Sequence, residues 1–264
     1  MTPYVTAFQA ITMRELGRFL TQRGRFLSAL VRPLVWLVIF AAGFRAALGI
    51  SIIPPYQTYI TYEVYIVPGL CAMILLFNGM QSSLSLVYDR EMGSMRLLLT
   101  APLPRRWLLF CKLCAGVFVG TLQVYAFLAI ARIFDVALPL NGYALVFPAI
   151  VLSGFMLGAL GLLISSLITL LENFATVMNF VIFPMFFLSS ALYPLWRMRE
   201  SSELLHDICA LNPFTYAVEL IRYSAYQSFA LVPLLVVLGC ATVFFALASR
   251  AYAPQQSKPL GFKR

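Results

Sequence analysis

Few side chains in this 264-residue chain could do chemistry, and they are scattered along it. The three lysines are Lys112, Lys258 and Lys263, and none of them follows a glycine. A Walker A loop needs a glycine-rich turn followed by lysine and then serine or threonine, because these groups hold phosphate and Mg²⁺. The sequence therefore predicts that this chain binds no ATP or other cofactor and does not hydrolyse ATP by that mechanism.

Metal and redox chemistry are also poorly supported. The chain has a single histidine, His206, and a lone CxxC formed by Cys111 and Cys114. A structural metal site needs a second ligand pair or a nearby histidine, so helix packing is the favoured interpretation of the two cysteines. We expect no catalytic residue and no metal site.

The richest group of charged side chains lies in the segment VYDREMGSMRLLLTAPLPRRWLLFCK, residues 87–112. It is amphipathic at first and is then broken by Pro102 and Pro104. A short polar helix with an apolar strip, here residues 89–99, is typical of a docking helix for a soluble partner. The alternative is a loop that only sets topology, with charges that contact water or lipid headgroups.

Composition indicates the elements that must position these groups. Apolar residues make up 61% of the chain, charged residues 11%, and mean hydropathy is +0.88, whereas soluble domains carry roughly 25% charged residues. Continuous apolar runs of roughly 20 residues predict membrane-spanning helices. We predict an all-α integral membrane protein, a single domain over residues 1–264 with six transmembrane helices. The spans are expected near 27–49, 64–88, 107–131, 143–171, 174–196 and 229–249.

Basic residues predict the orientation, because cytoplasmic loops retain Lys and Arg. With six spans, fourteen of the 19 basic residues fall on the side of the two termini. Both termini of this multi-pass protein are therefore expected in the cytoplasm. The net charge of +9 is then a topology signal, and we expect no nucleic-acid partner.

Two features near the membrane surface and one within the spans add three expectations. Arg14, Arg18 and Arg25 share one side of an N-terminal amphipathic helix, which we expect to lie on membrane lipids, although a charged flank that enforces topology is the alternative. Arg32 and Arg45, near the ends of the first span, are expected to reach the membrane interface. GxxxG pairs at residues 116–120 and 154–158 predict close helix packing.

Three further motifs follow the chain in order: YIVPGL at 65–70, SSALYPL at 189–195 and LNPFTYAVELIR at 211–222. Together with the segment 87–112, they resemble the permeases of ABC-2 type transporters, and most of all the drug-resistance and nodulation-factor export permeases of that family. The resemblance runs across nearly the whole chain.

The resemblance implies the membrane subunit of an ATP-binding cassette exporter in the bacterial cytoplasmic (inner) membrane. Such a permease forms a homodimer and pairs with two copies of a separate ABC ATPase, which binds ATP and Mg²⁺. The cargo would be amphipathic, lipid-like, drug-like or glycosylated. The chain itself would be a transporter subunit and not an enzyme.

The resemblance also assigns roles to residues. The helix at 89–99 would couple the permease to the ATPase through Asp89, Arg90, Glu91, Gly93, Ser94, Arg96, Leu97 and Leu98. Residues 194–227 would form short external re-entrant helices before the last span. Their external gate would include Tyr193, Pro194, Asn212, Pro213 and Phe214.

Two other classes remain as alternatives. A membrane-embedded lipid or glycan transferase would need a convergent cluster of acids, bases or metal ligands, which the sequence does not offer. An ion-coupled carrier would show inverted repeats and ionisable groups in the middle of the membrane. Co-purification with an ATPase would distinguish the exporter from both.

Overall fold

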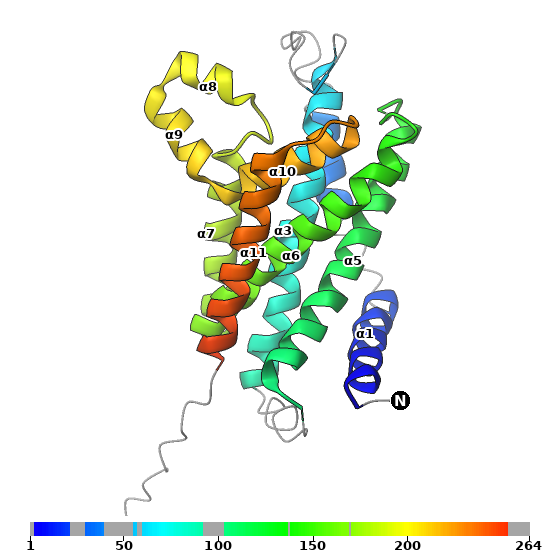
Figure 1. The fold of residues 1–264 in the computed structure, drawn as a ribbon, viewed down its shortest axis with the longest axis vertical. Coiled ribbons are helices and arrows are strands. Elements are labelled where there is room, and N and C mark those ends of the chain that lie inside the picture. Colours follow the sequence, from blue (N-terminus) through cyan, green and yellow to red (C-terminus); the bar gives the residue numbers. More distant parts are fainter. Residues whose placement is uncertain are drawn as a thin grey trace, which may run out of the picture.

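The structure is a computed structural model, and it describes residues 3–21, 30–39, 55–56, 60–91, 103–136, 138–168 and 170–252. Helices make up nearly all of these residues (Figure 1). They are α1 (Pro3–Thr21), α3 (Tyr62–Glu91), α5 (Arg105–Ile133), α6 (Gly142–Leu167), α7 (Leu171–Phe187), α8 (Leu195–Ser201), α9 (Glu203–Leu211), α10 (Pro213–Ala225) and α11 (Leu231–Ala251). One more short apolar helix covers Leu30–Ile39.

The long helices form a bundle around α3. This helix packs against α5, α6, α7 and α10, and α11 packs on α6. We call the end of the bundle where α3 ends and α5 begins the lower end, and the opposite end the upper end, as they stand in Figure 1. Helix α1 lies beside α5 near the lower end, whereas α8, α9 and α10 gather at the upper end.

Glycines let the central helices approach closely. A Cβ atom added at Gly79 on α3 would lie 3.0 Å from the Cα of Gly158 on α6, and one added at Gly116 on α5 would lie 2.9 Å from Ser82 Oγ. Small residues allow such contacts between helices in a lipid environment. The close packing predicted from the GxxxG pairs is confirmed.

Four of the predicted spans are helices long and apolar enough to cross a membrane, namely α3, α5, α6 and α11. Of the predicted first span, the structure describes only residues 30–39. The count of six spans therefore stays a prediction. The all-helical class is confirmed for the part of the chain that the structure describes.

The predicted boundaries of two spans were wrong. The fourth helix ends at Leu167, and the fifth runs over Leu171–Phe187 instead of 174–196. Residues 188–194 leave the helix because their backbone groups find partners outside it, as described below. Hydropathy alone does not detect this change, since the segment remains largely apolar.

Candidate functional site

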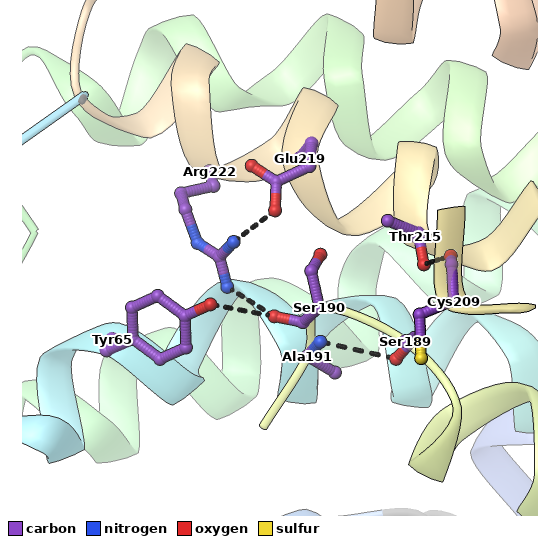
Figure 2. Close-up of polar contacts among 8 residues, drawn as sticks. All are labelled: Tyr65, Ser189, Ser190, Ala191, Cys209, Thr215, Glu219 and Arg222. Carbon is purple, nitrogen blue, oxygen red and sulfur yellow. Dashed lines mark hydrogen bonds and ion pairs between the residues drawn. The ribbon is translucent and has the colours of Figure 1, made fainter. Parts of the chain in front are cut away.

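Three of the four sequence motifs meet at the upper end of the bundle. Figure 2 shows the irregular backbone that follows α7 lying between side chains from α3 and α10. The hydroxyl of Tyr65 and Nη2 of Arg222 both donate to the carbonyl oxygen of Ser190, at 3.0 and 2.9 Å. The hydroxyl of Tyr62 donates to the carbonyl oxygen of Leu192 at 2.8 Å. Buried carbonyl groups outside helices need such partners, so these side chains make the break in the helix stable.

Asn212, a predicted gate residue, ties the end of α7 to the start of α10. Its Nδ2 donates to the carbonyl oxygens of Met185 and Leu188, at 2.8 and 2.6 Å. Its Oδ1 accepts a hydrogen bond from the backbone N–H of Phe214 at 3.0 Å and so caps α10. Pro213 occupies the first turn of α10, where its missing N–H costs nothing.

Arg222 is the charged centre of the upper end. Its guanidinium pairs with the carboxylate of Glu219 and lies 4.1 Å from the centre of the Tyr65 ring. Only 3% of the Arg222 residue is exposed. A buried charge needs both an opposite charge and hydrogen bonds, and Arg222 has both. Neither residue was among the predicted site residues, although both lie in the LNPFTYAVELIR motif.

A second contact that the sequence analysis did not predict, besides the Arg222–Glu219 pair, joins the motifs YIVPGL and SSALYPL. A Cβ atom added at Gly69 would lie 2.7 Å from the carbonyl oxygen of Ala191 and 2.8 Å from its Cα. Only glycine lets α3 approach the backbone of the segment after α7 this closely. The available signal was the glycine itself, directly after Pro68 within a predicted span.

An open pocket of about 480 Å³ lies beside this network. Its lining combines aromatic, aliphatic and charged side chains, and the five aromatic ones are Tyr56, Tyr65, Trp196, Tyr216 and Tyr223. Burial raises the pKa of Tyr56 to about 12, so its hydroxyl stays protonated at physiological pH. Of the predicted gate residues, Pro194 lines the pocket, whereas Tyr193 is exposed.

Phe214 completes the set of predicted gate residues that the structure describes. Its side chain is fully buried, and its ring lies 6.2 Å from that of Phe186 at the upper end of α7. It therefore holds α10 against the bundle as an apolar anchor. No part of its ring is exposed to line an open passage.

The lower end holds the described part of the predicted coupling helix. Asp89 is buried, and its Oδ2 lies 3.5 Å from Nζ of the buried Lys112 on α5. Glu15 on α1 is close enough to act electrostatically on Lys112. Asp89 therefore faces the bundle interior. Its contact with an ATPase stays a prediction.

Arg90 and Glu91 connect the end of α3 to the junction between α6 and α7. Nη1 of Arg90 donates to the carbonyl oxygen of Ile168 at 3.3 Å, and its guanidinium lies 4.9 Å from the centre of the Tyr252 ring. Glu91 Oε2 accepts a hydrogen bond from the backbone N–H of Leu171, also at 3.3 Å. The other predicted coupling residues lie outside the described residues, namely Gly93, Ser94, Arg96, Leu97 and Leu98.

The described residues do not assemble a catalytic or metal-binding constellation. No group of three His, Cys, Asp or Glu side chains among them could hold a metal ion. His206 lies 3.1 Å from its neighbour Asp207 on the exposed helix α9. The described geometry instead connects helices: the upper end has a hydrogen-bonded network beside a pocket, and at the lower end the last residues of α3 bind the α6–α7 junction.

Comparisons with known proteins agree with this geometry. The sequence model of the ABC-2 type transporter family matches residues 6–226. A "putative transport permease ycf38" from Porphyra purpurea is 28% identical over 223 residues, which cover 83% of this chain and 74% of that protein. The "probable multidrug ABC transporter permease YbhR" of Escherichia coli K12 is 31% identical over 170 residues, 63% of this chain and 45% of that protein. Because the family's sequence model spans most of its length, this chain belongs to the ABC-2 type transporter family.

Proposed function

We propose that this chain is the permease subunit of an ABC exporter and that it moves an amphipathic, lipid-like, drug-like or glycosylated molecule out of the cytoplasm. Two permease chains and two copies of a separate ATPase form the working unit. The ATPase binds ATP and Mg²⁺, because this chain lacks a Walker A sequence. Permeases of this family work with ABC ATPase subunits in general.

The contact between α3 and the α6–α7 junction carries this proposal. Arg90 and Glu91 are the last described residues before the predicted coupling segment, and both bind backbone groups of that junction. A displacement of the segment by an ATPase therefore acts on three helices at once. Energetic coupling needs such a contiguous physical connection between the driven and the moving parts.

The upper end supports a capped exit. Helices α8, α9 and α10 are short, and α10 is fastened to the bundle through Asn212 and Arg222. We infer that they are external re-entrant helices, covered by protein where their backbone lies at membrane depth. The aromatic pocket beside them suits an amphipathic cargo, because tyrosine and tryptophan combine an apolar ring with a polar tip.

Exposed apolar side chains support a homodimer through the first and fifth spans. Val31, Val35 and Val38 are exposed on the helix 30–39, and Phe180 and Phe183 are exposed on α7. Lipid covers such side chains, but so does a second copy of the chain. Trp36 packs on the ring of Phe187, at 5.8 Å between centroids, which places the helix 30–39 next to α7. The exposed apolar side chains of the two spans therefore lie on neighbouring helices.

The orientation follows from charge. We infer that the lower end faces the cytoplasm of a bacterium, with six spans in the inner membrane and both termini inside, because the predicted spans assign most basic residues to that side. Reporter fusions after Arg106 and after Arg264 are expected to be cytoplasmic, and one near Glu203 external. A cytoplasmic reporter at Glu203 would refute the six-span arrangement.

The decisive experiment is purification of the tagged permease together with co-expressed candidate ABC ATPases of the same organism. Native mass spectrometry is expected to show two copies of each subunit, and proteoliposomes are expected to transport only with ATP and Mg²⁺. A monomeric permease that transports without an ATPase would overturn the proposal. Chemical conversion of a lipid or glycan by the permease alone would favour a transferase instead.

A further inference from the structure

Arg32 lies far from where an arginine in a membrane protein is expected. The sequence predicts that it reaches the interface from the end of the first span. In the structure its guanidinium carbon lies 3.8 Å from the centre of the Phe77 ring, and the residue is exposed on the surface of the chain. This contact places Arg32 beside the middle of α3 rather than beside one of its ends. Arg45 lies outside the described residues.

The position of Phe77 defines the depth. It is twelve residues from Tyr65 at the upper end and twelve from Asp89 at the lower end of α3, about 18 Å from each at 1.5 Å per residue. The neighbouring helices agree. A Cβ added at Gly120, near the middle of α5, would lie 3.2 Å from Leu75 Cδ2, and one at Gly154, near the middle of α6, would lie 3.6 Å from the same atom.

Arg32 therefore sits near the middle of the bundle, too deep for its side chain to reach either interface. The Phe77 ring attracts the cation but does not neutralise it. Ionisable groups at this depth face a pathway, a cavity or a counter-ion in most membrane proteins. The question is which counter-ion this arginine has.

The part of the chain that the structure describes provides none. All ten acidic residues lie in that part, and none of its ion pairs includes Arg32. Every one of them lies toward an end of the bundle or on a short terminal helix: Glu15, Glu63, Asp89, Glu91, Asp135, Glu172, Glu200, Glu203, Asp207 and Glu219. A second copy in the same orientation is related by an axis along the membrane normal, so each of its residues keeps its depth. A homodimer therefore brings no carboxylate to this level either.

We propose that Arg32 and Phe77 bind the anionic group of an amphipathic molecule halfway across the membrane. This inference rests on the proposed transport function and names the cargo class: an apolar body that carries a phosphate or carboxylate. The planar guanidinium can bind two oxygens of such a group at once. Phe77 holds the guanidinium in place from one side and leaves its other side open to the ligand.

The test compares two probes that differ only in the head group, in nanodiscs of phosphatidylcholine. Variants with Trp107→Phe and Trp196→Phe retain Trp36, one helical turn from Arg32, as the sole tryptophan. Quenching of Trp36 fluorescence by brominated phosphatidate and by brominated phosphatidylcholine gives their relative binding constant at this site. The purified permease is used with a bound ATPase whose tryptophans are replaced by phenylalanine, without ATP, so that Trp36 remains the only tryptophan of the complex.

We expect phosphatidate to bind at least about tenfold more tightly than phosphatidylcholine, from charge-assisted hydrogen bonds. Arg32→Gln should bring the ratio near one, and Arg32→Lys should retain part of the preference. Phe77→Leu should lower the ratio about two- to tenfold. The matched control is Arg132→Gln, which removes another arginine that lies near an aromatic ring, 5.8 Å from the centre of Tyr143, but at the upper end of α5. It should leave the ratio unchanged.

Three outcomes would overturn the inference. The first is a ratio of the two binding constants near one in the parent protein. The second is an unchanged ratio in Arg32→Gln, also when this substitution changes the dimerisation of the permease. The third is displacement of the brominated phosphatidate by millimolar inorganic phosphate, since this would indicate a site for soluble anions. If Arg32→Gln does not fold, Arg32→Lys and Phe77→Leu carry the test. Loss of ATPase co-purification would count against the proposed function instead, because binding is measured without ATP.

Discussion

The two ends of the bundle hold their irregular backbone in different ways. At the upper end, side chains from α3 and α10 bind the carbonyl groups of Ser190 and Leu192, and the charged group among them is buried. At the lower end, Arg90 donates to the carbonyl oxygen of Ile168 and Glu91 accepts from the N–H of Leu171, both at 3.3 Å, and the second of these bonds is exposed. The upper end is therefore held by buried hydrogen bonds, and the lower end by a hydrogen bond that water can reach.

This difference indicates which end can move at a low cost in free energy. Breaking the upper network would leave a buried guanidinium and buried carbonyl groups without partners, which is expensive in a membrane interior. Breaking the lower contacts returns polar groups to water, which replaces the lost hydrogen bonds. A machine driven from the lower end would thus shift its lower contacts while the upper end keeps its internal arrangement.

The largest effect is expected from Arg222→Met. The substitution leaves Glu219 without its partner and removes one of the two donors to the Ser190 carbonyl oxygen. Breaking a buried ion pair from one side costs about 3–5 kcal/mol. The free energy of unfolding in mixed micelles would measure it, with Arg199→Met on the exposed surface of α8 as the control. Equal stability of the two variants would contradict a fastened upper end.

A smaller loss is expected from Gly69→Ala. The new methyl group would collide with the backbone of Ala191, and the backbone cannot move aside as a flexible side chain can. Overpacking of this kind costs about 1–3 kcal/mol. Gly239→Ala is the matched control on α11, because nothing lies within 4 Å of the added Cβ atom. This control should be neutral or slightly stabilising, since alanine is the better helix former, and thermal unfolding of both variants would show the contrast.

The sequence predicted the helices and the ends of the bundle at which the motifs lie, because these depend on local hydropathy and charge. It did not predict the contacts between the motifs. Tyr62 and Tyr65 bind carbonyl groups 130 and 125 residues away, and nothing in a hydropathy window encodes such a pairing. The end of the fifth predicted span was wrong for this reason: long-range hydrogen bonds let the helix stop at Phe187.

The sequence-based expectation for Arg32 differs from its packing in the structure for a related reason. A hydropathy window places the residue near the start of an apolar run, which indicates an interface. Depth in a bundle is set by which neighbouring side chains a helix packs on, and here that neighbour is Phe77. Asp89 differs in the same way: its charge and position in a polar segment indicate an exposed residue, but it faces Lys112.

The ion pair at the lower end gives an intermediate prediction. Lys112→Met should cost about 1–2 kcal/mol, between the values for exposed and buried pairs, because Nζ and Oδ2 of Asp89 are 3.5 Å apart near the end of the bundle. The double variant Asp89→Asn with Lys112→Met should recover part of this loss, because it no longer buries a charge without its partner. A double-mutant cycle on unfolding free energies measures the coupling. Purely additive losses would show that the pair contributes nothing.

The smallest effect on stability, and the sharpest on function, is expected from Glu91→Ala. Its hydrogen bond to the Leu171 N–H is exposed, so water can replace it, and the free energy of unfolding should change by at most about 0.5 kcal/mol. If the lower end transmits the ATPase motion, transport per ATP hydrolysed should still fall about three- to tenfold, since coupling energies of this kind are 0.5–2 kcal/mol. Gly93→Leu, in the same predicted helix, should act in the same direction, whereas Glu203→Ala at the upper end should change neither quantity.

Transport and ATPase rates in proteoliposomes at matched protein content separate coupling from folding. Normal transport by the double variant Glu91→Ala with Gly93→Leu would remove this segment from the mechanism and make the two ends mechanically equivalent.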